Sequence, residues 1–284
     1  MRLVRLIFGT TEGAVGAVLL SLLVFIALFA PVLSPGDPLD IAGPPLLHPF
    51  SMARLPLGTD SLGRDVLAGI IHGTRTSLTV GLAAAFAAIA VGVCVGLAAG
   101  FSGGLVDEAL MRVVDAFQIL PGFLLALALV SVAGASLPVV VLAIALGAWA
   151  APARLMRAQV LSIRERDYVA AARVTGMHPL EIAVKEILPN ALPPVLTLAA
   201  VIVAAAILTE SALSFLGLGD PNIVTWGTMI AEGRNVLRSA PFLSVLPGLA
   251  LVVTVITVYL VGEGVTQALA EGKAGQVDRQ GPTA

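Results

Sequence analysis

The chain has 284 residues, of which 58% are hydrophobic and only 12% are charged, and its formal net charge is −2. Soluble domains contain about 25% charged residues, so this composition excludes an ordinary soluble protein and indicates an integral membrane protein. The single cysteine, Cys94, excludes an intramolecular disulfide, and we expect no nucleic-acid partner.

Six apolar stretches are long enough to cross a membrane, since a span needs about 20 mostly apolar residues. They cover residues 15–33, 78–101, 113–132, 138–156, 192–216 and 242–261. Arg2 and Arg5 precede the first stretch, but its apolar run is too long for a signal peptide, so we expect a retained helix. The sequence therefore predicts an all-α integral membrane protein with six transmembrane helices.

The distribution of basic residues predicts the orientation. With the N-terminus inside, the outer segments hold five of the sixteen Lys and Arg, and the cytoplasmic segments hold the other eleven. Basic residues beside spans stay in the cytoplasm, so both termini are predicted to be cytoplasmic. We divide the chain into residues 1–73, with the first helix and an outer loop, a core of residues 74–268, and a cytoplasmic tail of residues 269–284. The polar stretch from Gly264 onward is expected to fray.

The outer segments are expected to hold a loop and a short helix. Proline and glycine are dense after the first span, which is typical of a loop. Thr59, Asp60 or Ser61 can then cap a short amphipathic helix lying in the membrane interface. In the second outer loop Trp226 is either an interfacial anchor or, together with Met229, a cap on a translocation path.

Glu210 is the main charged residue within the predicted spans. A charge at mid-membrane costs about 2.5–3.5 kcal/mol on insertion scales, so the side chain needs a partner or a role. It is either a structural carboxyl that bonds to Ser211 or Ser214, or a residue of the translocation path. The candidate path residues are Glu210, Ser214, Trp226 and Met229.

Residues 164–190, between the fourth and fifth spans, predict two helices separated by a glycine. Strong helix formers over residues 164–175 predict the first helix, and Gly176 supplies the left-handed residue that commonly follows a helix. Pro179 suits the first turn of a second helix, and Pro189 is expected to end it. The second helix is expected to carry an apolar stripe and an i,i+4 ion pair; these comprise Leu180, Val184, Ile187 and Leu188, and Glu181 with Lys185.

The first of these two helices has the pattern of a docking element. Three consecutive alanines beside Tyr168 form a small-residue face with charges around it, which suits a groove on another protein. The alternative is a basic helix lying on anionic lipid. The alternation of Glu165, Arg166 and Asp167 dilutes a lipid-binding face, so the pattern favours protein docking.

Motifs of catalysis and nucleotide binding are missing from the sequence. It contains no G-x-x-x-x-G-K-[ST], no H-E-x-x-H and no G-x-S-x-G. We therefore expect no catalytic residue, no metal site and no cofactor in this chain.

The loop resembles the signature of permease subunits of binding-protein-dependent ABC importers. That signature is E-A-A, three residues, G, then nine residues and I-x-L-P, and the chain has AAARVTG followed by MHPLEIAVKEILP. Ala170 replaces the usual glutamate, and Ile187 directly precedes Leu188. The segments PLGTDSLGRD, DEALMRVVDAFQILP, ALSFLGLG and TWGTMIAEG are similar to the C-type permease of the dipeptide, oligopeptide and nickel importer family.

The resemblance implies the type I importer bundle, with one peripheral N-terminal helix and a five-helix core. It also implies a coupling loop over residues 157–190, whose first helix docks on an ATPase. The residues it assigns to coupling are Arg166, Asp167, Tyr168, Ala170, Ala171, Ala172, Arg173, Gly176, Leu188 and Pro189.

The partners implied are a second homologous permease subunit, two cytoplasmic ATPase subunits that bind ATP and Mg, and an extracytoplasmic solute-binding protein, with membrane lipid around the spans. The expected location is the bacterial inner membrane, and the expected role is a non-catalytic subunit for import of short peptides. Dipeptide, oligopeptide, glutathione-like and nickel-chelate substrates all stay open. The alternative function is an ion-gradient-driven secondary transporter or channel, which would need ionisable residues at mid-membrane.

Overall fold

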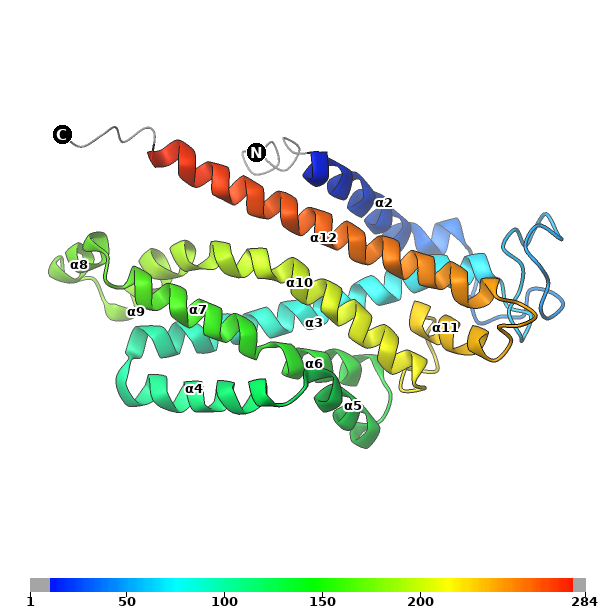
Figure 1. The fold of residues 1–284 in the computed structure, drawn as a ribbon, viewed down its shortest axis with the longest axis horizontal. Helices are drawn as coiled ribbons and strands as arrows, with labels where there is room; N and C mark the ends of the chain where they lie inside the picture. The colour runs from blue at the N-terminus through cyan, green and yellow to red at the C-terminus, as the bar shows by residue number, and fades with distance from the viewer. Residues whose placement is uncertain (1–10, 278–284) are drawn as a thin grey trace.

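The computed structural model describes residues 11–277, and four of its helices are long and apolar enough to cross a membrane (Figure 1). Three of them are the uninterrupted helices α2 (Thr11–Leu33), α3 (Val66–Ser102) and α12 (Phe242–Val277). The fourth span ends in α10 (Leu188–Phe215). These four match the first, second, fifth and sixth predicted spans.

The third and fourth predicted spans are each a bent pair of helices. α4 (Gly104–Ile119) and α5 (Gly122–Ala133) meet at 84°, and α6 (Leu137–Ala148) and α7 (Ala150–Ile163) meet at 44°. Pro121 precedes α5, and because proline lacks an N–H it cannot continue the ladder of α4. If each bent pair is one span, the structure has the six spans that the sequence predicts.

Two predictions about helix ends are wrong. The separate interfacial helix after Thr59 does not form, because Asp65 caps α3 by accepting from the Leu67 N–H, and α3 then continues for 37 residues. No proline interrupts that run, so nothing stops the helix between its outer end and the span. The polar stretch from Gly264 is helical to Val277 as part of α12 instead of fraying. The division of the chain at residues 73 and 268 stays a prediction.

α3 lies at the centre of the bundle and packs most extensively on α7. Three glycines spaced four apart on α3 face α7, and a Cβ added to Gly92, Gly96 or Gly100 would lie within 2.3–2.8 Å of an α7 atom. Small residues at this spacing let two helix backbones approach closely inside a membrane. α3 and α7 are therefore held together over the whole length of α7.

The two ends of the bundle carry different short helices. α8 (Asp167–Val174) lies at one end, the end toward which the last turns of α12 run (Figure 1). α11 (Trp226–Arg234) lies at the opposite end, beside the loop of residues 34–65. We call these the α8 end and the α11 end.

Candidate functional site

The first candidate site is α8 and the turns that hold it. α7 ends at Ile163, and α8 begins at Asp167 with Arg166 as its N-cap, so the predicted helix starts three residues later than residue 164. Most of the predicted docking residues are exposed, including Arg166, Asp167, Ala170, Ala171 and Arg173. The Tyr168 side chain is 43% exposed. The sequence therefore identified a surface that this chain leaves uncovered.

Val169 anchors α8 on the bundle. It is 0% exposed and belongs to a cluster of apolar side chains contributed by α7, α8, the helical segment of residues 182–187 and the start of α10. The fully buried members of that cluster include Met156, Ile182 and Ile187, and Ala172 packs against it. Burying one apolar side chain stabilises by about 1.5–3 kcal/mol, so Val169 fixes which face of α8 points outward. Sequence reasoning missed this residue, although it is the first apolar position inside α8.

Gly176 ends α8 as predicted. Its φ is +81°, and the Gly176 N–H donates to the Arg173 carbonyl while the Met177 N–H donates to the Ala172 carbonyl. These are the two hydrogen bonds of a Schellman motif, which needs a left-handed residue at this position. A Cβ on Gly176 would meet no atom within 4 Å, so the backbone angle alone requires glycine here.

The prediction for the return segment is wrong in two respects. α9 (Pro179–Glu181) continues without a break through the π-helix η1 (Ile182–Ile187) into α10, so Pro189 lies in the first turn of α10 and ends nothing. The predicted apolar stripe also shifts, because a π-helix bonds i to i+5. Leu180 is 67% exposed and Val184 is 47% exposed.

Ile187 of the predicted stripe is buried as expected, and the other η1 residues that face the bundle are Ile182 and Ala183. Ile182 and Ile187 are five residues apart, which is the spacing of the π-helix. The predicted pair of Glu181 and Lys185 does form, with 2.5 Å between the carboxylate and the amine. Leu188 is half-buried and Pro189 is exposed.

The second candidate site, at the α11 end, joins all four predicted path residues. Trp226 is fully buried, and its indole N–H donates to the Ile70 carbonyl at 3.2 Å. Gly73 leaves room for the Trp226 ring, and Gly69 leaves room for the end of the Met229 side chain. Trp226 therefore packs inside the fold against α3 and is not an interfacial anchor.

Glu210 lies beneath α11 and is bonded as the structural alternative expects. Its side chain is 2% exposed and accepts from the hydroxyls of Ser214 at 2.7 Å and Ser211 at 3.3 Å. The hydroxyl of Thr225, the N-cap of α11, also interacts with this carboxyl group. Glu210 thus ties α10 to the start of α11, and a role for Glu210, Ser214, Trp226 and Met229 in the translocation path stays a prediction.

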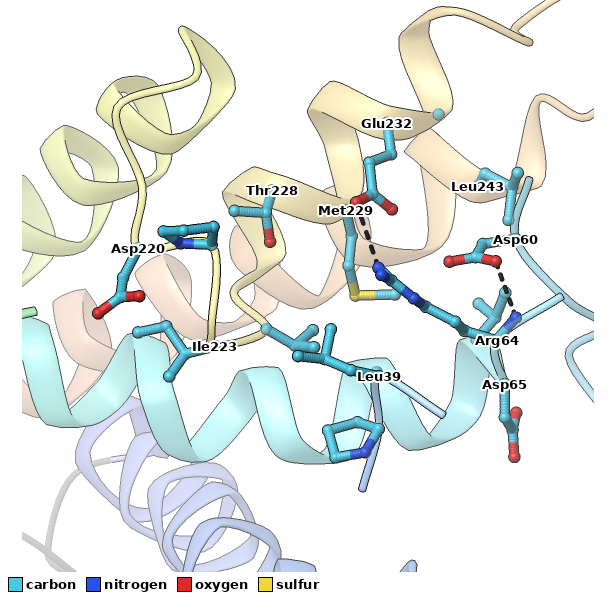
Figure 2. A pocket seen from close by; sticks show the side chains of 16 residues that line it. Leu39, Asp60, Arg64, Asp65, Asp220, Ile223, Thr228, Met229, Glu232 and Leu243 are labelled. Atoms are coloured by element: carbon cyan, nitrogen blue, oxygen red, sulfur yellow. Dashed lines mark hydrogen bonds and ion pairs between the residues drawn. The ribbon is translucent and has the colours of Figure 1, made fainter. Parts of the chain in front are cut away.

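A cavity of about 180 Å³ lies between α11, the start of α3 and the neighbouring loops (Figure 2). Arg64 points into it and pairs with Glu232 at 3.5 Å, while Asp60 accepts from the Arg64 backbone N–H. Burial raises the pKa of Glu232, the nearby Asp60 raises it further, and Arg64 opposes the rise. On the opposite side of the cavity, hydrogen bonds from Asn222 and Leu137 hold the pKa of Asp220 below its ordinary value.

The first site, at α8, suits docking, and the second, at the α11 end, is packed within the chain. Within residues 11–277 no three His, Cys, Asp or Glu side chains lie close enough together to hold a metal ion. Four charged groups that line the cavity are bonded within this chain: Asp65 and Asp220 through capping and turn bonds, and Arg64 with Glu232 through an ion pair. The exposed helix α8 is the feature that offers a partner a surface.

Comparison with known proteins gives a consistent result. Residues 92–273 match the family model described as "Binding-protein-dependent transport system inner membrane component". The chain is 40% identical to the di/tripeptide transport system permease protein DppC of Pseudomonas aeruginosa, over 92% of this chain and 89% of that protein. It is 41% identical to the dipeptide transport system permease protein DppC of Escherichia coli, over 92% of this chain and 90% of that protein.

Among solved structures, an inward-facing form of the MetNI methionine ABC transporter is similar, with a TM-score of 0.57 and 19% identity. The match covers 71% of this chain and 96% of that chain. At this identity the likeness shows the fold alone. The six-span bundle predicted from sequence is therefore confirmed as an ABC importer permease fold.

Proposed function

The chain belongs to the family of binding-protein-dependent transport system inner membrane components, and from that membership we propose that it is the transmembrane permease subunit of an ATP-driven peptide importer. The peptide substrate follows from the curated relatives, which are named as dipeptide or di/tripeptide permeases and match over most of their length. ATP hydrolysis is assigned to partner subunits, because the sequence has no phosphate-binding loop.

One observation carries the proposal. α8 exposes its polar and small side chains while Val169 fixes it to the bundle, so a partner that binds α8 pulls on α7 and α10 together. Two cytoplasmic ATPase subunits, holding ATP and Mg, would seat α8 and its counterpart in a second permease. A solute-binding protein would deliver peptide at the α11 end.

The proposed orientation places the α8 end in the cytoplasm of a bacterial inner membrane. α12 runs toward that same end, and α2 runs from beside the second half of α12 toward the α11 end, so the first residue of α2 and the last residue of α12 both lie on the side of α8 (Figure 1). The bias of Lys and Arg toward these segments favours the same orientation. Closure of the ATPase dimer would then displace α8 sideways, and the rigid contact of α3 with α7 would carry the motion through the membrane.

Co-purification and uptake test the proposal. Ala171→Glu places a charge on the exposed face of α8 without touching Val169, and Gly176→Pro removes the left-handed residue that ends the helix. Both variants are expected to lose ATPase subunits during purification and to abolish ATP-dependent uptake of radiolabelled alanyl-alanine in proteoliposomes. Ala53→Glu is the matched control, since Ala53 is also exposed but lies in the loop at the α11 end.

Two results would contradict the proposed function. One is full retention of the ATPase subunits by both α8 variants when membrane insertion is normal. The other is uptake by this chain alone, driven by a proton gradient without ATP, which would support the ion-gradient alternative.

A further inference from the structure

Two arginines of α7 reach across to carboxylates of α4. The Arg157 guanidinium donates through Nε to Asp107 Oδ1 at 2.5 Å and through Nη2 to Asp107 Oδ2 at 2.6 Å. Nearer the middle of the bundle, Arg154 Nη2 lies 2.5 Å from Asp115 Oδ1. A bidentate pair of this kind is stronger and more directional than a single charged hydrogen bond.

The contact between Asp107 and Arg157 is partly shielded from solvent. The Asp107 side chain is 14% exposed and that of Arg157 is 32% exposed. For comparison, Glu108 and Arg112 form an i,i+4 pair within α4 at 3.7 Å, with side chains 65% and 78% exposed. Exposed pairs contribute little, whereas a shielded pair between two helices can set their relative position.

α4 is held by ion pairs as well as by one apolar contact, in which Met111, Val114 and Phe117 join a cluster of side chains from α3 and α7. Of the 16 residues of α4, all of which the structure describes, only Val114 is buried. α4 is also joined to α3 by Gly103 and Gly104, whose φ angles are 68° and 55°, so this turn is not a continuation of the helix. In the part of α4 before Met111, Asp107 links the helix to α7 through Arg157.

α7 is the helix that leads directly into α8. Arg164, where α7 ends, donates to the Gly100 carbonyl at 2.9 Å, which holds that end of α7 on α3. A displacement of α8 therefore moves α7 and α3 as one body. α4 receives the displacement through the ion pairs of Asp107 with Arg157 and of Asp115 with Arg154, of which the first is bidentate and the more shielded from solvent.

The far ends of α4 and α7 meet at two helix breaks. Gly122 starts α5 and Gly147 lies near the end of α6, and a Cβ on either glycine would lie 2.9 Å from the carbonyl oxygen of the other. Both glycines line a cavity of about 190 Å³ between α5, α6 and α10. A movement of α4 relative to α7 would consequently change the shape of this cavity.

We propose that Asp107 and Arg157 form a charged strut that makes α4 follow α7 when α8 is displaced, and so transmits the motion of the ATPases to the breaks at Gly122 and Gly147. This proposal rests on the proposed function, in which ATPase subunits bind α8 and displace it. Asp107 and Arg157 act here as positioning residues.

Charge reversal on the assembled importer tests the strut. The four proteins are the wild type, Asp107→Arg, Arg157→Asp and the double reversal, each purified with its partner subunits. In each single variant two like charges face each other, and we expect the peptide transported per ATP hydrolysed to fall about tenfold, which corresponds to about 1.4 kcal/mol of lost coupling. The double reversal restores an opposite pair and should recover most of the ratio.

A spin-label distance gives a readout that does not depend on the substrate. Leu105 on α4 is 85% exposed and Ser162 on α7 is exposed, so both accept a label in a Cys94→Ala background. The distance between the labels should stay the same in the nucleotide-free state and with ATP and vanadate. In Asp107→Arg it should change between the two states.

Controls separate the strut from a general loss of structure. Glu108→Arg disrupts the exposed pair one residue away and should leave both readouts unchanged. If the reversed charge in Asp107→Arg prevents folding, Asp107→Asn replaces it, because it removes the charge and keeps the volume of the side chain. It should lower the coupling ratio and change the label distance in the same direction.

Wild-type coupling in both single reversals, or no recovery in an assembled double reversal, would overturn the strut. Failure of the wild type to import alanyl-alanine would count against the proposed function, while the label distance would still decide on the strut.

Discussion

The α8 end and the α11 end are each built around a short helix that follows a long one, yet they treat their side chains in opposite ways. α8 exposes Tyr168, Ala170 and Ala171 and buries Val169 as an anchor. α11 buries Trp226 completely, and its Gly227 lies closely against Ser211 and Ser214 of α10. The contrast teaches that α8 leaves polar and small side chains uncovered, whereas α11 is packed into the fold by contacts within this chain.

The largest expected effect is on the stability of the α11 end. Trp226→Ala removes the ring that fills the space above Gly73, and replacing a buried tryptophan costs about 3–5 kcal/mol. We expect a clearly lower melting temperature and faster proteolysis of the loop of residues 34–65 in nanodiscs. Trp226→Phe keeps most of the bulk, so its melting temperature should lie between those of the wild type and Trp226→Ala. An unchanged melting temperature in Trp226→Ala would mean that the α11 end does not depend on this buried side chain.

An intermediate effect is expected at α8, on docking instead of stability. Tyr168→Ala truncates a side chain that is 43% exposed, so the melting temperature of the chain should hold. Aromatic residues at the centre of interfaces are frequent hot spots, and we expect binding of the ATPase subunits to weaken by about tenfold, or about 1.4 kcal/mol. The measurement is a titration of ATPase onto immobilised permease, with Tyr168→Phe as control. A lower melting temperature with unchanged binding of the ATPase subunits would mean that Tyr168 serves the stability of the chain and not docking.

The smallest effect is expected at Lys185. Its ion pair with Glu181 lies on one helical segment, and both side chains are well exposed to solvent. Such pairs are screened by salt, so Lys185→Ala should change neither the melting temperature nor the ATPase titration. A marked loss of docking in this variant would mean that the docking surface extends past Gly176 onto the return segment.

Much of the fold follows from the sequence because a helix that crosses lipid needs a long apolar stretch, and such a stretch can be recognised in the sequence directly. The positions of all six spans and the end of α8 at Gly176 were predicted on that basis and on the chemistry of left-handed glycine. The exposed docking face followed from the small residues beside Tyr168.

The rest depends on contacts that the local pattern does not contain. The continuation of α3 to Val66 depends on whether anything interrupts a helix, and the apolar pattern of residues 66–71 alone does not decide this. The anchoring role of Val169 depends on Ile182 and Ile187, which only meet it after the chain turns at Gly176. The π-helix was missed because its period differs from the α-helical period used to assign Leu180 and Val184 to the apolar face.

That π-helix has a consequence for how α8 is aimed. A π turn accommodates one more residue than an α turn, and each residue of an α-helix advances the chain by about 100° around the axis. The number of residues in η1 therefore fixes the direction in which α8 points relative to the axis of α10. Removing a single residue between Ile182 and Ile187 would leave every side chain of α8 chemically intact and turn its exposed face in a different direction.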